Sequence, residues 1–195
     1  MGTWDVTWKR GFACRQPIFI EGLPGIGNVG KIAADYLVEQ LKAKKVATIF
    51  GYDMPNNVFV TEKSLVQLPR IEIYHYVHDK QDYLFLTGDA QPAQERPSYE
   101  LCIKLLDTLK DCGVKEIVTL GGIGLNEVPE DPSVYVTGNK KTFVQLFKKQ
   151  GADPKVYGVV GPIMGISGLL LGLSKQYRIP AAALLGETFA HPMYI

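Results

Sequence analysis

The chain has 195 residues, of which 46% are hydrophobic, and its 21 lysines and arginines nearly balance its 20 acidic residues. This balance excludes the strong basic field of a nucleic-acid-binding protein, and the apolar content excludes a disordered chain. The length fits one globular domain over residues 1–195. Cys14, Cys102 and Cys112 have no metal-ligand spacing, so we expect three reduced thiols in a cytoplasmic protein without a metal site.

Short apolar runs, which predict strands, alternate along the chain with stretches of helical periodicity. The predicted strands cover residues 17–21, 46–50, 58–61, 66–68, 71–76, 83–87, 116–120, 134–137, 155–160 and 181–185. The predicted helices cover residues 28–44, 98–111, 141–150 and 163–175. Ser98 is expected to cap the second helix, and Gly113 to follow its end.

These strands are apolar throughout and are separated by helices. Such a pattern predicts a three-layer α/β/α sandwich with a mostly parallel sheet. The apolar stretch Ile163–Leu173 is about half as long as a membrane span, so we expect a buried helix there and no contact with a membrane. Because the segment 164–173 is apolar on nearly all sides, it indicates either deep burial or an interface in a homo-oligomer.

Glycines follow the predicted strands with unusual regularity. They are Gly22, Gly51, Gly88, Gly121, Gly161 and Gly186. In open α/β sheets the carboxyl ends of the strands form the edge where ligands bind. Any small-molecule site is therefore expected at this edge.

The loop after the first predicted strand contains Gly25, Gly27 and Gly30 in the spacing of a dinucleotide-binding motif, with Asp53 after the next strand. Pro24 and the extra residues before Gly25 argue against a nicotinamide site. The same loop nearly matches a phosphate-binding P-loop, but Ile32 replaces the hydroxyl residue that holds Mg²⁺, which excludes an ordinary ATPase.

Two interpretations of the loop stay open. In the first, its amides and the following helix bind an anion. The residues of that site would be Gly25, Gly27, Asn28, Gly30, Lys31, Gly121 and Gly122. In the second, which we favour, the glycines permit a tight turn and close packing of the helix on the sheet. Neither interpretation requires a cofactor.

Four acidic residues follow predicted strands and are candidates for acid–base chemistry. They are Asp53, Asp89, Glu127 and Glu187. No nucleophile, base or metal-ligand set accompanies them, and Ser167 lacks the second glycine of a nucleophile elbow. We therefore favour a role in capping helices and binding loop amides, and we predict no catalytic residue.

Five ordered motifs together resemble the proteasome assembly chaperone family, in its PAC2-type archaeal branch. They are Glu21-Gly-Leu-Pro-Gly-Ile-Gly-Asn-Val-Gly30, Leu86-Thr-Gly-Asp-Ala-Gln-Pro92, Gly121-Gly-Ile-Gly124, Gly161-Pro-Ile-Met-Gly-Ile-Ser-Gly-Leu-Leu-Leu-Gly172 and Leu185-Gly-Glu-Thr188. The resemblance implies a three-layer α/β/α domain similar in outline to nucleoside phosphorylases. It also implies a non-catalytic, self-associating protein that holds proteasome alpha subunits. The alternative is an enzyme or sensor that binds a nucleotide or phosphate ligand on the glycine loops.

The last residues, Met193, Tyr194 and Ile195, form a hydrophobic–Tyr–any pattern. Tails of proteasome activators look similar, and a free carboxylate next to a tyrosine suits a pocket between alpha subunits. The alternative, which we favour, is that relatives continue beyond this point and that Tyr194 is an internal packing residue.

Overall fold

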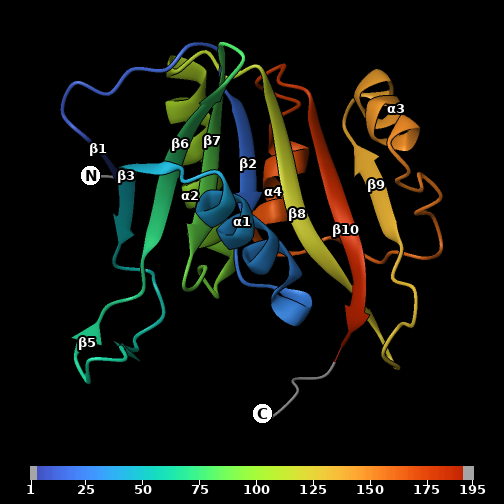
Figure 1. The fold of residues 1–195 in the computed structure, drawn as a ribbon, viewed down its shortest axis with the longest axis horizontal. Helices are drawn as coiled ribbons and strands as arrows, with labels where there is room; N and C mark the ends of the chain where they lie inside the picture. Colours follow the sequence, from blue (N-terminus) through green and yellow to red (C-terminus); the bar gives the residue numbers. More distant parts are fainter. Residues whose placement is uncertain (1–3, 191–195) are drawn as a thin grey trace.

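The computed structural model describes residues 4–190, and most of their strands join one eight-stranded sheet (Figure 1). The order across it is β1-β3-β6-β7-β2-β8-β10-β9. These strands are β1 (Trp4–Trp8), β2 (Ile18–Gly22), β3 (Lys44–Gly51), β6 (Ile71–His78), β7 (Gln81–Gly88), β8 (Glu116–Leu125), β9 (Val134–Gly138) and β10 (Ala181–Phe189). A separate small hairpin pairs β4 (Phe59–Val60) with β5 (Val66–Gln67).

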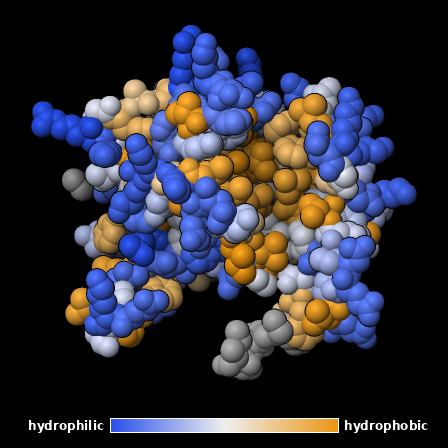
Figure 2. Space-filling model, viewed as in Figure 1, coloured by the Kyte–Doolittle hydropathy of each residue, from blue (hydrophilic) through white to orange (hydrophobic). Residues whose placement is uncertain are grey.

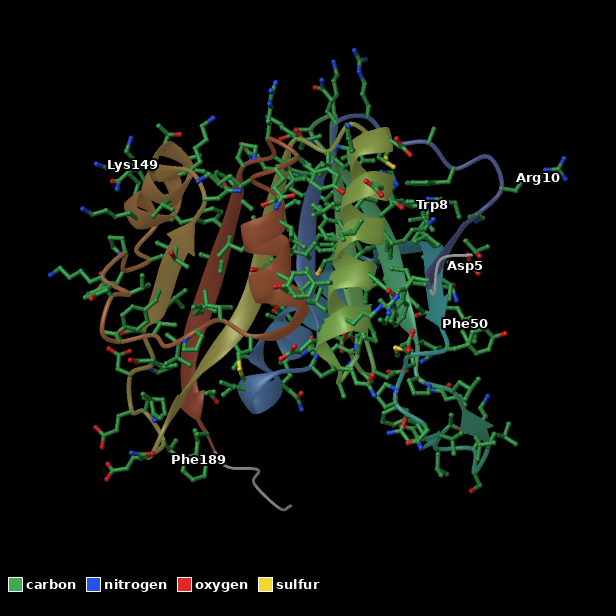
Figure 3. The ribbon with its side chains drawn as sticks, turned by 180° about the vertical axis from the view of Figure 1, so that it is seen from behind. Asp5, Trp8, Arg10, Phe50, Lys149 and Phe189 are labelled. Carbon is green, nitrogen blue, oxygen red and sulfur yellow. The ribbon has the colours of Figure 1, made fainter. Side chains whose placement is uncertain are left out.

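Four helices and one 3₁₀ turn accompany the sheet. They are η1 (Ile26–Asn28), α1 (Val29–Gln40), α2 (Glu95–Asp111), α3 (Lys141–Lys149) and α4 (Gly165–Leu173). α1 lies in front of the sheet in Figure 1, whereas α2 and α4 lie in front in the reverse view of Figure 3. The expected three-layer α/β/α architecture is confirmed.

The sheet is mixed. The central strands β7, β2, β8 and β10 are parallel neighbours, as expected, but the strands on both sides of them pair antiparallel. One reason lies in the turn between β6 and β7, where only Asp79 and Lys80 separate the paired residues His78 and Gln81. Both turn residues have positive φ, 48° and 65°, and such a two-residue turn joins antiparallel strands.

Alternate residues of the central strands enter different cores, because successive side chains point to opposite faces. Phe19 and Ile117 belong to the largest core, which α2 and α4 cover with residues such as Leu105 and Leu170. The neighbouring Val118 and Ala182 face the other side, where Phe143 of α3 packs on them. α1 and α3 therefore share one face of the sheet.

The ends of the helices differ in part from the prediction. α2 begins at Glu95, and the Ser98 hydroxyl donates to the Gln94 carbonyl within the first turn instead of capping the helix. The other end is confirmed: Gly113 follows the last turn with φ 67°, and the amide of Val114 bonds the carbonyl of Leu109 at 2.9 Å.

The strand predicted at residues 155–160 is wrong. This segment holds only one isolated bridge, between Tyr157 and Val160, and the side chain of Tyr157 is fully exposed. Gly158 takes φ 81°, a conformation that interrupts an extended strand. Its valines and tyrosine have high strand propensity, but Tyr157 and Val159 are exposed and only Val160 packs against a core.

Two further differences concern the glycines at the sheet edge. β8 and β10 extend beyond their predicted ends, so Gly121, Gly122 and Gly186 lie within strands. Gly161 follows no strand, because residues 155–160 form none. Among residues 4–190, no helix combines the length and the apolar character needed to cross a membrane.

Candidate functional site at the glycine loop

The loop between β2 and α1 touches the sheet backbone, and glycines make this contact. A Cβ atom on Gly30 would lie 2.2 Å from the carbonyl oxygen of Leu120 in β8. A Cβ atom on Gly22 would lie 2.2 Å from the carbonyl oxygen of Gly30, and one on Gly122 would lie 2.4 Å from that of Ile26. Because no larger residue fits these positions, their glycines serve close packing between the loop, α1 and β8.

The other two loop glycines, Gly25 and Gly27, differ in backbone conformation and in the space around them. Gly27 has φ 58°, and a Cβ atom there would meet the side chain of Thr188 at 2.6 Å. Asn28, the residue before α1, has φ 53° and makes no side-chain cap hydrogen bond. At Gly25, by contrast, a Cβ atom would meet nothing within 4 Å. The packing interpretation therefore accounts for Gly27 and Gly30 but not for Gly25.

The cation of Lys31 is held beside α1 by another residue of the helix. Its Nζ lies 2.8 Å from Oδ2 of Asp35, and Oδ1 of Asp35 accepts a 2.6 Å hydrogen bond from the Thr87 hydroxyl. This network ties the start of α1 to β7. Lys31 thus has a structural partner, which distinguishes it from a P-loop lysine that contacts phosphates.

The four predicted acids do not form one site. Asp53 follows β3 and Glu187 lies in β10, and these strands are separated by five steps across the sheet, about 24 Å at the usual strand spacing. Asp89 follows β7 and accepts hydrogen bonds from the amide and Nε of Arg70, at 3.1 and 3.4 Å.

The remaining acids, Glu187 and Glu127, have different surroundings. Glu187 accepts hydrogen bonds from the amide of Ser133 at 2.9 Å and from the hydroxyl of Tyr135 at 3.3 Å. Glu127 is exposed in the loop after β8. Over residues 4–190, histidine, cysteine and acidic side chains form no cluster that could hold a metal ion.

A buried carboxyl group, which the sequence interpretation missed, lies at the end of β2. The side chain of Glu21 is 0% exposed, and its Oε1 accepts a 3.0 Å hydrogen bond from the amide of Leu23. Its Oε2 and the hydroxyl of Thr119 on β8 are both buried without a hydrogen-bond partner among the described residues. Glu21 and Thr119 are paired across the two parallel strands.

Burial raises the pKa of Glu21 to about 7, although the Ser167 hydroxyl and the Leu23 amide oppose the change. The reason is that a charge far from water is costly unless it is fully paired. The signal is present in the sequence: Glu21 ends an apolar run predicted to be a strand of a sheet covered on both faces. An acid on such a strand has no solvent-facing side to occupy.

Apolar side chains also gather on the face that carries α1. Figure 2 shows them between α1 and α3, over the central strands. Ile32 and Tyr36, one helical turn apart, are 63% and 61% exposed. An open pocket of about 310 Å³ adjoins α1, lined by Ile20, Leu37, Leu41, Tyr76, His78, Tyr83 and Phe85. α4, predicted to be either deeply buried or an interface, packs against α2, β8 and β10.

Comparison with known proteins shows which family this chain belongs to. The sequence profile described as the PAC2 family matches residues 19–193, nearly the whole chain. The chain belongs to the PAC2 family. The matched residues include the glycine loop and Glu21. The predicted docking tail, Met193, Tyr194 and Ile195, lies outside the residues that the structure describes.

Solved structures of similar proteins agree. PbaB of Pyrococcus furiosus, described as an archaeal proteasome activator, is 32% identical, and the match has a TM-score of 0.88 and covers 98% of this chain and 82% of PbaB. PbaA of the same organism, an archaeal homolog of proteasome-assembly chaperone, is 22% identical, with a TM-score of 0.77 and coverage of 96% and 77%. At that lower identity, PbaA supports the fold alone.

An uncharacterised protein of Methanocaldococcus jannaschii is 30% identical over 171 residues. The match covers 88% of this PAC2 chain but 65% of that relative, so the chain spans about two thirds of the relative's length. The resemblance to the proteasome assembly chaperone family is thereby confirmed at the level of family and fold.

Proposed function

We propose that this PAC2 protein is a non-catalytic, oligomeric binding protein that holds proteasome alpha subunits. The observation that carries the proposal is the similarity to PbaB, a proteasome activator, over almost the whole of this chain. The site geometry supports it, because Gly22, Gly30 and Gly122 serve close packing and the four acids do not gather into one site. Binding of a partner protein requires neither a nucleophile nor a metal.

The apolar surface over α1 and the central strands supports self-association. A monomeric protein rarely exposes a large contiguous apolar patch, and such patches mark contact surfaces. Ile32 and Tyr36 lie on the exposed side of α1, and half-buried Ile20, Leu120 and Leu184 lie on the sheet beside it. A homo-oligomer that uses this face would remove these side chains from water.

Native mass spectrometry tests the proposal, on the protein alone and mixed with alpha subunits from its own source. We expect one defined homo-oligomer and a complex of fixed stoichiometry with alpha subunits. A homo-oligomer that leaves alpha subunits free contradicts the holding function. A monomer that still binds alpha subunits contradicts only self-association.

A variant without Met193–Ile195 locates the contact. Loss of the complex with the homo-oligomer unchanged assigns the contact to the tail, as its hydrophobic–Tyr pattern suggests. An unchanged complex assigns the contact to the folded domain.

A further inference from the structure

A small hairpin stands apart from the main sheet and carries exposed apolar side chains. It pairs β4 with β5, and Figure 1 shows it below β3 and β6, where it extends away from the rest of the fold. None of residues 56–68 is buried. Because a two-stranded hairpin is at best marginally stable in water by itself, a surface that covers it would stabilise it.

One side of this hairpin is entirely aliphatic. Val60 and Val66 are paired directly across its two strands. Val58 and Leu68 lie two residues further along each segment, and because side chains alternate between the faces of a strand, they fall on the same side. These four side chains, which we call the aliphatic ridge, are between 51% and 72% exposed. A single copy of the chain therefore leaves the ridge in contact with water.

The tip of the hairpin is polar and closes the ridge into a defined shape. The amide of Thr61 donates a 2.8 Å hydrogen bond to the Leu65 carbonyl, and the amide of Leu65 donates a 3.3 Å hydrogen bond to the Thr61 hydroxyl. Between them lie the charged residues Glu62 and Lys63. A hairpin that inserts into a membrane would have to bury these charges, so the tip favours a partner protein that contacts the ridge from the side.

The same chain also has an apolar hollow. The open pocket of about 310 Å³ beside α1 is lined on the helix side by Leu37 and Leu41. On the sheet side it is lined by Tyr76 and Tyr83, which are paired across β6 and β7. Its volume is at the lower end of the range for ligand pockets, so it suits a few aliphatic side chains. The pocket adjoins the face of α1 for which self-association is proposed above.

One copy of the chain does not bring its own ridge and its own pocket together. The hairpin precedes Ile71, the first residue of β6, whereas Tyr76 and His78 line the pocket near the other end of that strand. β6 is 8 residues long, which separates its two ends by about 24 Å. The ridge and the pocket can therefore meet only between copies.

We propose that the aliphatic ridge of one copy packs into the α1 pocket of a second copy, an inference that rests on the self-association proposed above. A second copy is the favoured occupant, because each copy brings one ridge and one pocket, and the pocket is continuous with the exposed face of α1. The contact joins two different surfaces of the chain. It is therefore complete only in a closed assembly, in which every ridge is matched by a pocket and both leave water.

Two variants of the full chain test the contact. Val60→Ser combined with Val66→Ser removes the centre of the ridge, whereas Leu41→Arg places a charge in the pocket. Each variant alone should dissociate about tenfold more readily than the unaltered chain, as measured by sedimentation over a dilution series. An equimolar mixture of the two should form a heterodimer in native mass spectrometry, because one intact ridge and one intact pocket remain.

A matched control and a second measurement accompany these variants. Val128→Ser combined with Val159→Ser should leave the oligomer unchanged, because both valines are exposed but lie outside the hairpin and the pocket. A photoreactive benzophenone side chain at position 66 reports the contact without disrupting the fold. Irradiation should join it to α1 or to residues 76–85 of another copy.

The outcomes separate this contact from self-association in general. A monomeric unaltered chain overturns both. A homo-oligomer that stays fully assembled in the ridge variant overturns the contact alone and assigns the ridge to a different partner protein. A mixture of the two variants that stays monomeric, or cross-links confined to other segments, overturns the pairing of ridge and pocket.

Discussion

Glu21 is a carboxylic acid at a position that water does not reach. Its orphan Oε2 and the orphan hydroxyl of Thr119 belong to residues paired across β2 and β8, so their side chains leave the sheet on the same face. Because burial raises the pKa of Glu21 to about 7, the group carries a proton through most of the acidic range. Protonated Glu21 carries an O–H donor, whereas the ionised group has none.

The stability of the fold should therefore fall as the pH rises from 4.5, the ordinary pKa of a glutamate, to about 7, the pKa of the buried Glu21. In the unfolded chain the pKa returns to its ordinary value of 4.5, so between this pH and about 7 the folded state binds one proton more than the unfolded state. Deprotonation then removes about 3 kcal/mol of unfolding free energy. In Glu21→Gln this loss should be absent, and the variant should be the more stable protein at pH 8, as measured by urea unfolding.

Glu72 offers a matched control with the opposite sign. Burial opposes ionisation there, but hydrogen bonds from Tyr74 at 2.7 Å and Lys45 at 3.0 Å together hold the pKa of Glu72 below its ordinary value. Glu72 thus contributes stability that is present above its unfolded pKa and is lost as the pH falls. Glu72→Gln should weaken the fold most at pH 8, and equal pH profiles for the two variants would refute the assignment.

At the scale of elements, the glycine loop fixes how closely α1 approaches the sheet. Gly22 and Gly30 let the helix start lie against the backbone of β2 and β8, and Gly122 receives the turn η1. Glycines also build phosphate-binding loops, because close helix packing and phosphate binding both need backbone that no side chain covers. Sequence alone therefore left two interpretations open, and only the contacts of each glycine separate them.

Substitutions at two positions of this loop should have very different effects. In Gly30→Ala the added methyl group meets the rigid carbonyl of Leu120, so the fold should lose about 3 kcal/mol of unfolding free energy. In Gly25→Ala the methyl group enters open space, and the change should stay within about 0.5 kcal/mol. Urea unfolding of both variants makes the comparison, and similar losses would contradict the packing interpretation.

The alternation of strands and helices could be predicted because apolar spacing differs between the two elements. The antiparallel pair β6–β7 was harder, since its turn Asp79-Lys80 lacks the glycine that typically marks such hairpins. Residues 155–160 show the reverse error, because strand propensity describes a residue type and not the neighbour that would pair with it. Glu21 was overlooked because the acids that follow strands were examined as one group, although an acid at the end of an apolar run carries its own signal of burial.

For the whole molecule, the two faces of the sheet are covered unequally. α2 and α4 pack together over the largest core, whereas α1 and α3 stand apart and leave apolar side chains visible between them (Figures 2 and 3). From the sequence, the glycine-rich helix could be either deeply buried or an interface in a homo-oligomer. Because such a helix is apolar on all sides, its sequence does not indicate whether the core or a partner protein covers it. In the structure α4 packs on the core.

Self-association should therefore depend on α1. Tyr36→Ser removes an exposed aromatic ring from the centre of the proposed contact, so the homo-oligomer should dissociate at least about tenfold more readily, as for other interface aromatics. Ile103→Ser on α2 is the matched control, because Ile103 is also an exposed apolar residue but lies on the opposite face. Light scattering over a dilution series should show the first variant alone dissociating, and an unaltered first variant would exclude the α1 face.

The strand order also determines when parts of the chain can fold during synthesis. β6 and β7 are consecutive and close a hairpin as soon as both have been made, whereas β2 has no neighbour in the sheet until β7 appears some 60 residues later. At ordinary translation rates this interval lasts roughly 3 to 12 s, and its second partner, β8, arrives later still. Throughout that interval the apolar run around Phe19 has no partner strand, so this part of the chain is the most exposed to aggregation during synthesis.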